Sequence, residues 1–364
     1  MLKRAGPSAR LFLYMPQEKS LEENSGMRNI LRYIITRTLM TIPMVFILLT
    51  IIFVVLRLMP GDPVSAMLGG HAPEKVIEQK REELGLNKPM TAQYADYLWK
   101  ICHLDLGDSM VLQQKVTSAI AEKLPATIEL TFFGMLITLI LGVFLGAYAA
   151  DKRRTMRDSA IRLYGIVVYC IPVYWLGLML QLIFGIWLDW LPIAGRTGAR
   201  IFTSDFEYSG FYILDTLLKM DWEAFGDVLI HLVLPSLTLG LTLSGIFVRL
   251  TRANMLDVLK ADYILAAESR GIKHSTVVYR HALKNAFIPI LTMMGLQVAL
   301  LMAGAILTET TFSWPGMGRL LLERIYLRDY PMIQGVIIVF ALMVAFISLL
   351  VDIIYAIVDP RIRY

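Results

Sequence analysis

Cysteine is almost missing from this chain of 364 residues, in which Cys102 and Cys170 are the only two. Cys102 falls in a polar stretch and Cys170 inside an apolar run, so we expect no disulfide between them. His274 and His281 stand seven residues apart, whereas two metal ligands on one helix face need the i, i+4 spacing. The sequence therefore predicts neither a disulfide framework nor a metal-binding site.

Charged residues are missing from six long apolar windows. Each window is close to or longer than the roughly 20 residues that a helix needs to cross about 30 Å of hydrocarbon. Hydrophobic residues make up 56% of the chain and the mean hydropathy is +0.59, values that exclude a soluble globular protein. We predict an all-α integral membrane protein with six transmembrane helices. The windows are residues 38–56, 130–150, 163–188, 228–248, 285–308 and 330–351.

The same absence of charge argues against several classes of function. Proton- or sodium-coupled carriers, voltage sensors and intramembrane hydrolases place ionisable or nucleophilic groups at membrane depth. The six windows contain no Asp, Glu, Lys or Arg, and the chain has no G-x-x-x-x-G-K-[ST] loop to bind nucleotide phosphates. We expect no catalytic residues, so energy for any transport must come from another subunit. An ion-coupled carrier or channel is the alternative of another class.

Basic residues cluster beside the windows, and the pI of about 9.1 reflects membrane orientation rather than binding to nucleic acid. If six helices span the membrane, all four clusters fall on one side, which is then cytoplasmic. The acid-rich segment 189–227 falls on the other side. Both termini are therefore predicted to be cytoplasmic. The clusters are Arg28, Arg32 and Arg37; Lys152, Arg153, Arg154, Arg157 and Arg162; residues 249–284; and Arg361 and Arg363.

The windows divide the chain into a membrane domain and its extramembrane segments. A long extracytoplasmic loop follows the first window and has room for two or three short helices, one over residues 74–84 and ended by Gly85. The predicted divisions are a cytoplasmic tail at 1–26, the first transmembrane helix at 27–58, the extracytoplasmic loop at 59–125, a five-helix transmembrane domain at 126–358 and a cytoplasmic C-terminus at 359–364.

Residues 249–284 form a basic polar segment between the fourth and fifth windows. Asp262 can cap a short helix, and Gly271 can end it because glycine adopts the left-handed conformation without steric cost. These signals predict a helix over residues 263–270. A second helix is predicted from Ser275 to just before Pro289, because the residue ahead of a proline avoids helical geometry.

One face of the short helix carries two small residues. Tyr263, Ala266, Ala267 and Arg270 follow the i, i+3, i+4, i+7 spacing, so another surface could approach the two alanines closely. The spacing alone leaves two interpretations open. The segment is either an ordinary cytoplasmic loop or a protruding helix that docks into a partner.

Uncharged polar and small residues stand inside the apolar windows. Gln181, Gln297 and Gln334 either line a pathway or make interhelical hydrogen bonds, and the sequence leaves both open. Small residues at four-residue spacing let helices pack closely. These are Gly142 with Gly146, and Gly240 with Ser244 and Gly245.

Two proline- and glycine-rich stretches are predicted to form tight turns at the membrane surface. The first contains Pro60, Gly61 and Asp62, and the second contains Trp314. We interpret both mainly as structural turns. Contact with an extracytoplasmic binding protein is the alternative for these four residues.

Several of these residues together resemble a known signature. Ala266-Ala267, Gly271, and Asn285 with Ile288-Pro289 are similar to the coupling loop of binding-protein-dependent ABC transporter permeases. Leu265 stands where that signature has a glutamate, a difference often found in the oligopeptide, dipeptide and nickel branch. Further stretches similar to this branch are RLMPGDP at 57–63, LGL at 84–86, DLGDS at 105–109, LPATIEL at 124–130, FSWPGMG at 312–318, DYP at 329–331 and DPR at 359–361.

This resemblance implies a multi-pass permease subunit of an ATP-driven importer, surrounded by lipid in the cell membrane. In that family a second permease completes the pathway, two ATPases using ATP and Mg²⁺ bind the coupling helices, and an extracytoplasmic binding protein delivers the solute. The chain itself is then not an enzyme and binds no cofactor. Peptides are the predicted solute, with oligosaccharides and nickel chelates as alternatives. On this resemblance the residues that couple to the ATPase are Asp262, Tyr263, Ala266, Ala267, Arg270 and Gly271.

Overall fold

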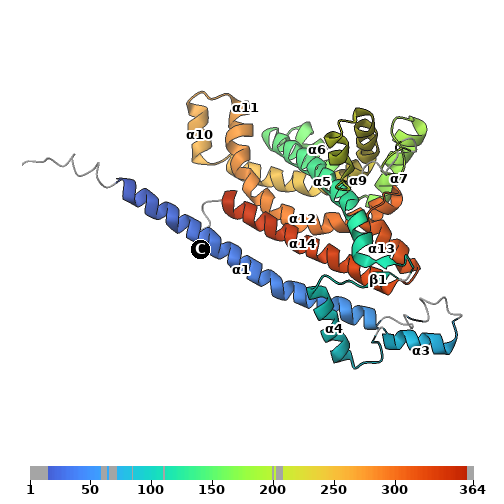
Figure 1. The fold of residues 1–364 in the computed structure, drawn as a ribbon. Coiled ribbons are helices and arrows are strands. Elements are labelled where there is room, and N and C mark those ends of the chain that lie inside the picture. Colours follow the sequence, from blue (N-terminus) through green and yellow to red (C-terminus); the bar gives the residue numbers. More distant parts are fainter. Residues whose placement is uncertain are drawn as a thin grey trace, which may run out of the picture.

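The computed structural model describes residues 15–58, 64, 72–83, 85–109, 111–198, 201 and 208–358. Helices dominate this part of the chain, as the sequence predicts (Figure 1). Its described strands form one short antiparallel hairpin, in which β1 (Asp108–Ser109) pairs with β2 (Gln114–Lys115). The fold is therefore a helical bundle with small extramembrane elements at both ends.

Four described helices are long and apolar enough to cross a membrane, or five if a bent pair counts as one span. The four are α1 (Met15–Leu58), α5 (Val116–Asp151), α9 (Trp222–Val258) and α14 (Tyr330–Val358). The bent pair is α6 (Met156–Cys170) with α7 (Val173–Leu180) and the π-helical η2 (Gln181–Trp187). The fifth predicted window, residues 285–308, lies in α12 (Leu283–Thr311), a helix of 29 residues that is not among these spans.

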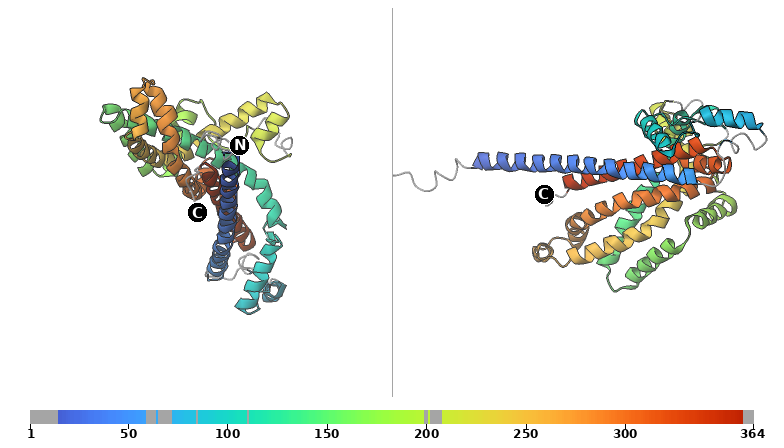
Figure 2. Two further views of the ribbon diagram at one scale, coloured as in Figure 1. Left: turned by 90° about the vertical axis from the view of Figure 1, so that its left-hand side faces the viewer. Right: turned by 90° about the horizontal axis from the view of Figure 1, so that it is seen from below.

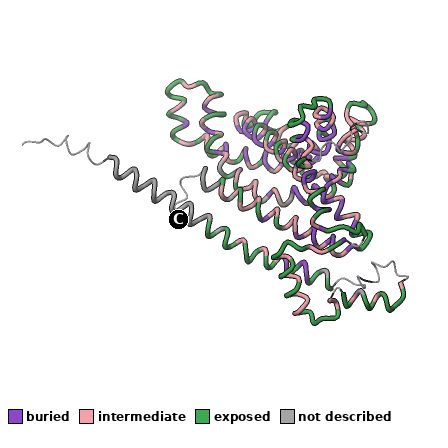
Figure 3. Tube along the Cα trace, in the orientation of Figure 1, coloured by how far each residue is buried: buried purple, intermediate pink, exposed green. Residues whose placement is uncertain are grey.

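The N-terminal helix starts earlier than predicted. α1 begins at Met15, so residues 15–26 of the segment predicted as a cytoplasmic tail are helical, and the helix runs for 44 residues. Proline is tolerated in a first helical turn, and the Gln, Glu and Lys residues that follow Pro16 favour helix. Figure 3 shows most of the described part of α1 exposed, and Figure 2 shows it running beside α14 and beyond the bundle.

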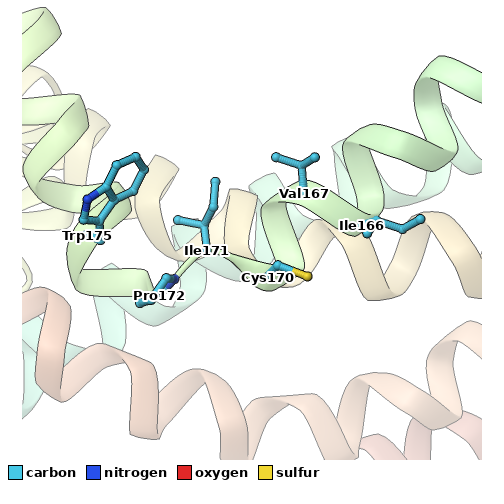
Figure 4. Close-up of a pocket in the computed structure, with 6 residues that line it drawn as sticks. All are labelled: Ile166, Val167, Cys170, Ile171, Pro172 and Trp175. Atoms are coloured by element: carbon cyan, nitrogen blue, oxygen red, sulfur yellow. The ribbon is translucent and has the colours of Figure 1, made fainter.

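The third predicted window is not a continuous helix. Its two halves meet at an angle of 105° around Ile171 and Pro172. Proline cannot donate a backbone hydrogen bond, and Ile171 before it is extended, with φ −79° and ψ 126°. The bend leaves an apolar hollow of about 460 Å³ beside it (Figure 4). Its lining residues are Ile166, Val167, Cys170, Ile171, Pro172 and Trp175.

Two other helices pass through prolines at which the sequence predicted an end or a loop. α5 starts at Val116, ten residues before the predicted boundary, and contains Pro125. The predicted helix after residue 274 also continues through Pro289, as α11 (His274–Thr276), the π-helical η4 (Val277–Ala282) and α12. Packing against neighbouring helices outweighs the local cost of each proline.

The long segment between α1 and α5 contains α3 (Glu74–Glu83) and α4 (Met90–Cys102). Gly85, with φ +67°, follows α3 and confirms the predicted glycine stop. Two further short helices are α8 (Tyr212–Leu218), before α9, and α13 (Met317–Tyr326), between α12 and α14. Figure 1 places α3, α4, β1 and α13 at one end of the bundle.

Helices α5 and α9 pack closely through small residues. A Cβ added at Gly142 would lie 2.3 Å from Phe247 Cβ, and one added at Gly146 would lie 2.8 Å from the Val248 carbonyl oxygen. Gly245 faces α6 in the same way, since its added Cβ would lie 2.3 Å from the carbonyl oxygen of a glycine there. The predicted helix-packing role of these glycines is thus confirmed.

Candidate functional site

The segment between α9 and α12 contains a short helix, α10 (Asp262–Ser269). Figure 1 shows α10 and α11 projecting from the end of the bundle opposite α3 and α4. The predicted glycine stop is confirmed, because Gly271 has φ +76°. The predicted cap is wrong: Ala261 occupies the N-cap position without a side-chain bond, and Asp262 is the first helical residue. Its carboxylate still favours the positive end of the helix dipole.

The inner face of α10 is packed against the rest of the protein. Ile264 is 1% exposed, and Ala267 packs against the same apolar cluster. This cluster packs α10 against the ends of α5, α9 and α12 and against η4. Its buried members are Ala147 and Ala150 from α5, Met255 from α9, Ile264 from α10, Val277, Val278 and Ala282 from η4, and Ala286 from α12.

The outer face of α10 differs from the predicted one. Ala266 is exposed, as expected for a docking residue, and Leu265 beside it is 55% exposed. Ala267, predicted on the same face, instead turns inward, because the i, i+3 pair of Ile264 and Ala267 fills the buried cluster. The accessible face therefore centres on Leu265 and Ala266. Asp262, Tyr263, Glu268, Ser269 and Arg270 are also exposed.

A hydrogen bond connects α10 to α12. The Asn285 side-chain amide donates to the Tyr263 hydroxyl at 2.8 Å. Tyr263 is 44% exposed, so its ring is both part of the accessible surface and tied to a membrane helix. Tyr263 lies in the predicted coupling segment and Asn285 in the signature that follows it, but only the folded structure brings them together.

Ion pairs missed by the sequence reasoning hold the helix ends around α10. Arg252 in α9 donates to both carboxylate oxygens of Asp158 in α6, at 2.7 and 2.9 Å. Asp151, at the end of α5, contacts His274 at 2.6 Å and Lys152 at 2.8 Å. This hydrogen bond with Asp151 raises the pKa of the Lys152 ammonium. Two aspartates within an otherwise basic stretch were the available signal, since a basic segment is expected to use its few acids as partners.

The three glutamines that the sequence suggested for a pathway have different surroundings in the described structure. The Gln181 amide donates to the carbonyl oxygens of Ile193 at 2.7 Å and Thr311 at 3.1 Å, which is the interhelical alternative. Gln297 is 4% exposed, and its side-chain oxygen has no partner among the described atoms. Gln334 is half-buried on α14. Their assignment to a pathway stays a prediction.

The residues predicted as alternative contacts for a binding protein divide into two groups. Pro60, Gly61 and Asp62 lie outside the described residues. Trp314 is fully buried, and its indole N–H donates to the Ala126 carbonyl at 2.9 Å. A buried ring cannot contact another protein directly, so its surroundings favour the structural role and correct the contact prediction.

Two buried carboxylates, Glu129 and Glu309, lie next to the apolar windows. Glu129 pairs with Arg196 at 2.5 Å and accepts a hydrogen bond from the Ile213 N–H at 3.0 Å. The Arg196 guanidinium lies 3.6 Å from the centre of the Tyr212 ring. Glu309 accepts from the Thr127 hydroxyl at 2.6 Å. The pair between Glu129 and Arg196 attaches the segment before α8 to α5.

None of the described residues forms a group of three or more His, Cys, Asp or Glu side chains that could hold a metal ion. The arrangement at α10 is thus one of packing, hydrogen bonds and ion pairs. Such an arrangement can transmit a displacement mechanically, because α10 is packed into the protein on one face and presents an accessible face beside the ends of several long helices.

Comparison with known proteins identifies the chain's family. Residues 142–364 match the model of the binding-protein-dependent transport system inner membrane component, and residues 30–131 match the N-terminal model of such membrane components. The dipeptide transport system permease protein DppB of Alkalihalophilus pseudofirmus is 40% identical over 334 residues, which cover 92% of this chain and 100% of that protein.

Two further relatives are similarly complete. The di/tripeptide transport system permease protein DppB of Pseudomonas aeruginosa is 38% identical, covering 92% of this chain and 99% of the relative. The glutathione transport system permease protein GsiC of Pectobacterium atrosepticum is 37% identical with the same coverage. These relatives are permease subunits rather than ATPases. The chain is a multi-pass inner-membrane protein and belongs to the binding-protein-dependent transport system inner membrane components.

Proposed function

We propose that this chain is the permease subunit of an ATP-driven peptide importer and that α10 is the helix onto which a cytoplasmic ATPase docks. The observation that carries the proposal is the two-sided character of α10. Its inner face is buried with the ends of α5, η4 and α12, while Leu265 and Ala266 on its outer face are exposed. A groove that grips the outer face could therefore move the membrane helices.

The proposed topology has six spans with both termini in the cytoplasm. Four of the six spans are α1, α5, α9 and α14. The bent pair of α6 and α7 supplies the fifth, and α12 supplies the sixth. Figure 1 supports the orientation, because α10, the start of α1 and the end of α14 lie at one end of the bundle, and α3, α4 and β1 lie at the other. The basic residues flanking the windows support the same assignment.

The proposed partners follow from what this chain lacks. It has no phosphate-binding loop, so ATP and Mg²⁺ would be used by two partner ATPases. A second, related permease would complete the pathway, and an extracytoplasmic binding protein would deliver the solute. Peptides are the proposed solute because the named relatives transport dipeptides, di- and tripeptides, or glutathione, itself a tripeptide. Oligosaccharides and nickel chelates are the alternatives.

Enlarging an exposed side chain of α10 tests the docking proposal and leaves the buried face of the helix unchanged. Ala266→Trp should block a close-fitting groove and reduce peptide-stimulated ATP hydrolysis and uptake by at least about fivefold, since overpacking a tight contact costs roughly 1–3 kcal/mol. Met156→Trp is the matched control, because Met156 is 85% exposed at the start of α6. Both variants should assemble normally in the membrane. Full uptake by Ala266→Trp in the reconstituted complex would refute the docking role.

A second experiment separates the importer from an ion-coupled carrier. The purified chain in liposomes, given a proton or sodium gradient and labelled dipeptide, should accumulate no peptide. Adding the ATPases, the second permease, the binding protein and ATP should produce accumulation. Concentrative uptake by the chain alone would establish the carrier alternative.

A further inference from the structure

His274 joins α10 to the end of α5 through two carboxylates. Its Nε2 lies 2.6 Å from Asp151 Oδ1, and its Nδ1 lies 3.6 Å from Glu268 Oε1. Asp151 is the last residue of α5, Glu268 belongs to α10, and His274 begins α11. One imidazole ring therefore bridges two elements that are distant in the sequence.

The two ends of this bridge are unequal. The Asp151 side chain is 8% exposed, whereas those of Glu268 and His274 are 45% and 62% exposed. A buried carboxylate is costly without partners, so Asp151 is the fixed end, held by His274 and Lys152. Glu268 is the end that moves with α10.

The protonation state of the ring decides whether both ends are held. A neutral imidazole has one N–H to donate, whereas the imidazolium has two and carries a positive charge that attracts both carboxylates. The contact with Glu268, at 3.6 Å, is longer than a hydrogen bond and becomes an ion pair only when the ring is protonated. Histidine side chains change charge between about pH 5 and pH 8. The contact with Glu268 should therefore strengthen when the ring is protonated.

The other charged and titratable groups near the bridge come from three elements, because Arg157 of α6 interacts with Lys152 and donates to the Tyr148 hydroxyl at 2.9 Å. Lys152 follows α5 and Tyr148 lies within it, while Tyr279 belongs to η4 and is close enough to interact with Asp151. Lys152 contacts the second oxygen of Asp151 and so competes with His274 only at that end. The contact with Glu268 depends on His274.

We propose that His274 is a positioning residue for coupling, whose protonated ring holds α10 against the end of α5 in the orientation that the ATPase engages. This inference rests on the proposed docking of α10. It implies that peptide-stimulated ATP hydrolysis depends on cytoplasmic pH through a group outside the ATPase.

The first test is a pH profile of peptide-stimulated ATP hydrolysis in the reconstituted complex. Relative to wild type, His274→Gln should lower the stimulated rate at pH 6.5 by about twofold to fivefold, the size expected for an exposed ion pair such as that of His274 with Glu268, and should do little at pH 8. His274→Arg keeps a charge at every pH, so it should retain activity with a flatter profile. His281→Gln is the matched control, because the recorded contact of that histidine is made by its backbone carbonyl.

The second test reads the position of α10 without the ATPase. Amide hydrogen exchange of residues 262–269 in the full chain in nanodiscs should be about twofold to fivefold faster in His274→Gln than in wild type at pH 6.5. The two should exchange alike at pH 8. If Ala266→Trp leaves uptake intact while His274→Gln still speeds exchange in α10, the docking proposal is refuted but the positioning of α10 by His274 is supported. Exchange and pH profiles unchanged by His274→Gln would overturn the proposal.

Discussion

Replacing Gly142 by alanine tests one of the closest helix contacts described in the membrane domain. The added Cβ would lie 2.3 Å from Phe247 Cβ and 3.3 Å from Phe247 Cα. Carbon atoms in ordinary contact are about 3.5 Å apart or more, so α5 and α9 would have to separate locally by roughly 1.2 Å. Phe247 cannot rotate away, because its Cβ position follows from the backbone and its side chain is fully buried.

The expected cost is that of overpacking a core, about 1–3 kcal/mol, which shifts an unfolding equilibrium roughly 5- to 140-fold. Gly226 in α9 is the matched control, because a Cβ there would meet nothing within 4 Å. Gly226→Ala should stabilise the helix by up to about 1 kcal/mol, since glycine in a helix loses more entropy than alanine. Gly142 lies in a helix too, so the helix gain is common to both variants, and they should differ by the overpacking cost of about 1–3 kcal/mol.

Thermal unfolding of each purified variant in nanodiscs, followed by tryptophan fluorescence, measures this difference. Gly142→Ala should melt below wild type, and Gly226→Ala at or above it. The same order should appear in the amount of protein that survives heating as a single peak in size-exclusion chromatography. If Gly142→Ala melts at or above wild type, α5 and α9 do not approach as closely as described, and the packing argument fails.

Three further predictions concern other parts of the molecule. Gly271→Val should strain the end of α10 at a cost of about 1–2 kcal/mol or more, because a β-branched residue is disfavoured at φ +76°. It should therefore lower peptide-stimulated ATP hydrolysis, and wild-type stimulation would contradict this. Arg196→Met should destabilise the protein by about 3–5 kcal/mol in thermal unfolding, because it leaves the buried Glu129 carboxylate unpaired. Adding Glu129→Gln should restore part of this loss, and equal stability of the single and double variants would argue against it. In a chain lacking Cys102 and Cys170, cysteines at Thr155 and Ser275 should react with impermeant thiol reagents only from the cytoplasm and one at Gln79 only from outside. Labelling of Ser275 from outside would disprove the six-span topology.

Membrane character and the location of α10 followed from the sequence because both depend on local composition. Charge-free windows of about 20 residues are rarely stable outside a bilayer, so their presence identifies a membrane protein. Gly271 predicted the end of α10 because the left-handed conformation is a property of one residue. The family resemblance likewise rested on short local motifs, which the comparisons confirmed.

Tertiary packing decided the features that depend on which surfaces meet. Proline is a helix breaker locally, yet Pro125 and Pro289 lie inside helices while Pro172 lies at a bend of 105°. The spacing placed Ala266 and Ala267 on one face, but the buried cluster around Ile264 turned only Ala267 inward. Contacts such as Asp151 with His274 and Glu129 with Arg196 join residues 123 and 67 positions apart in the chain. No local pattern encodes such pairs, because they exist only when the helices that carry them are assembled.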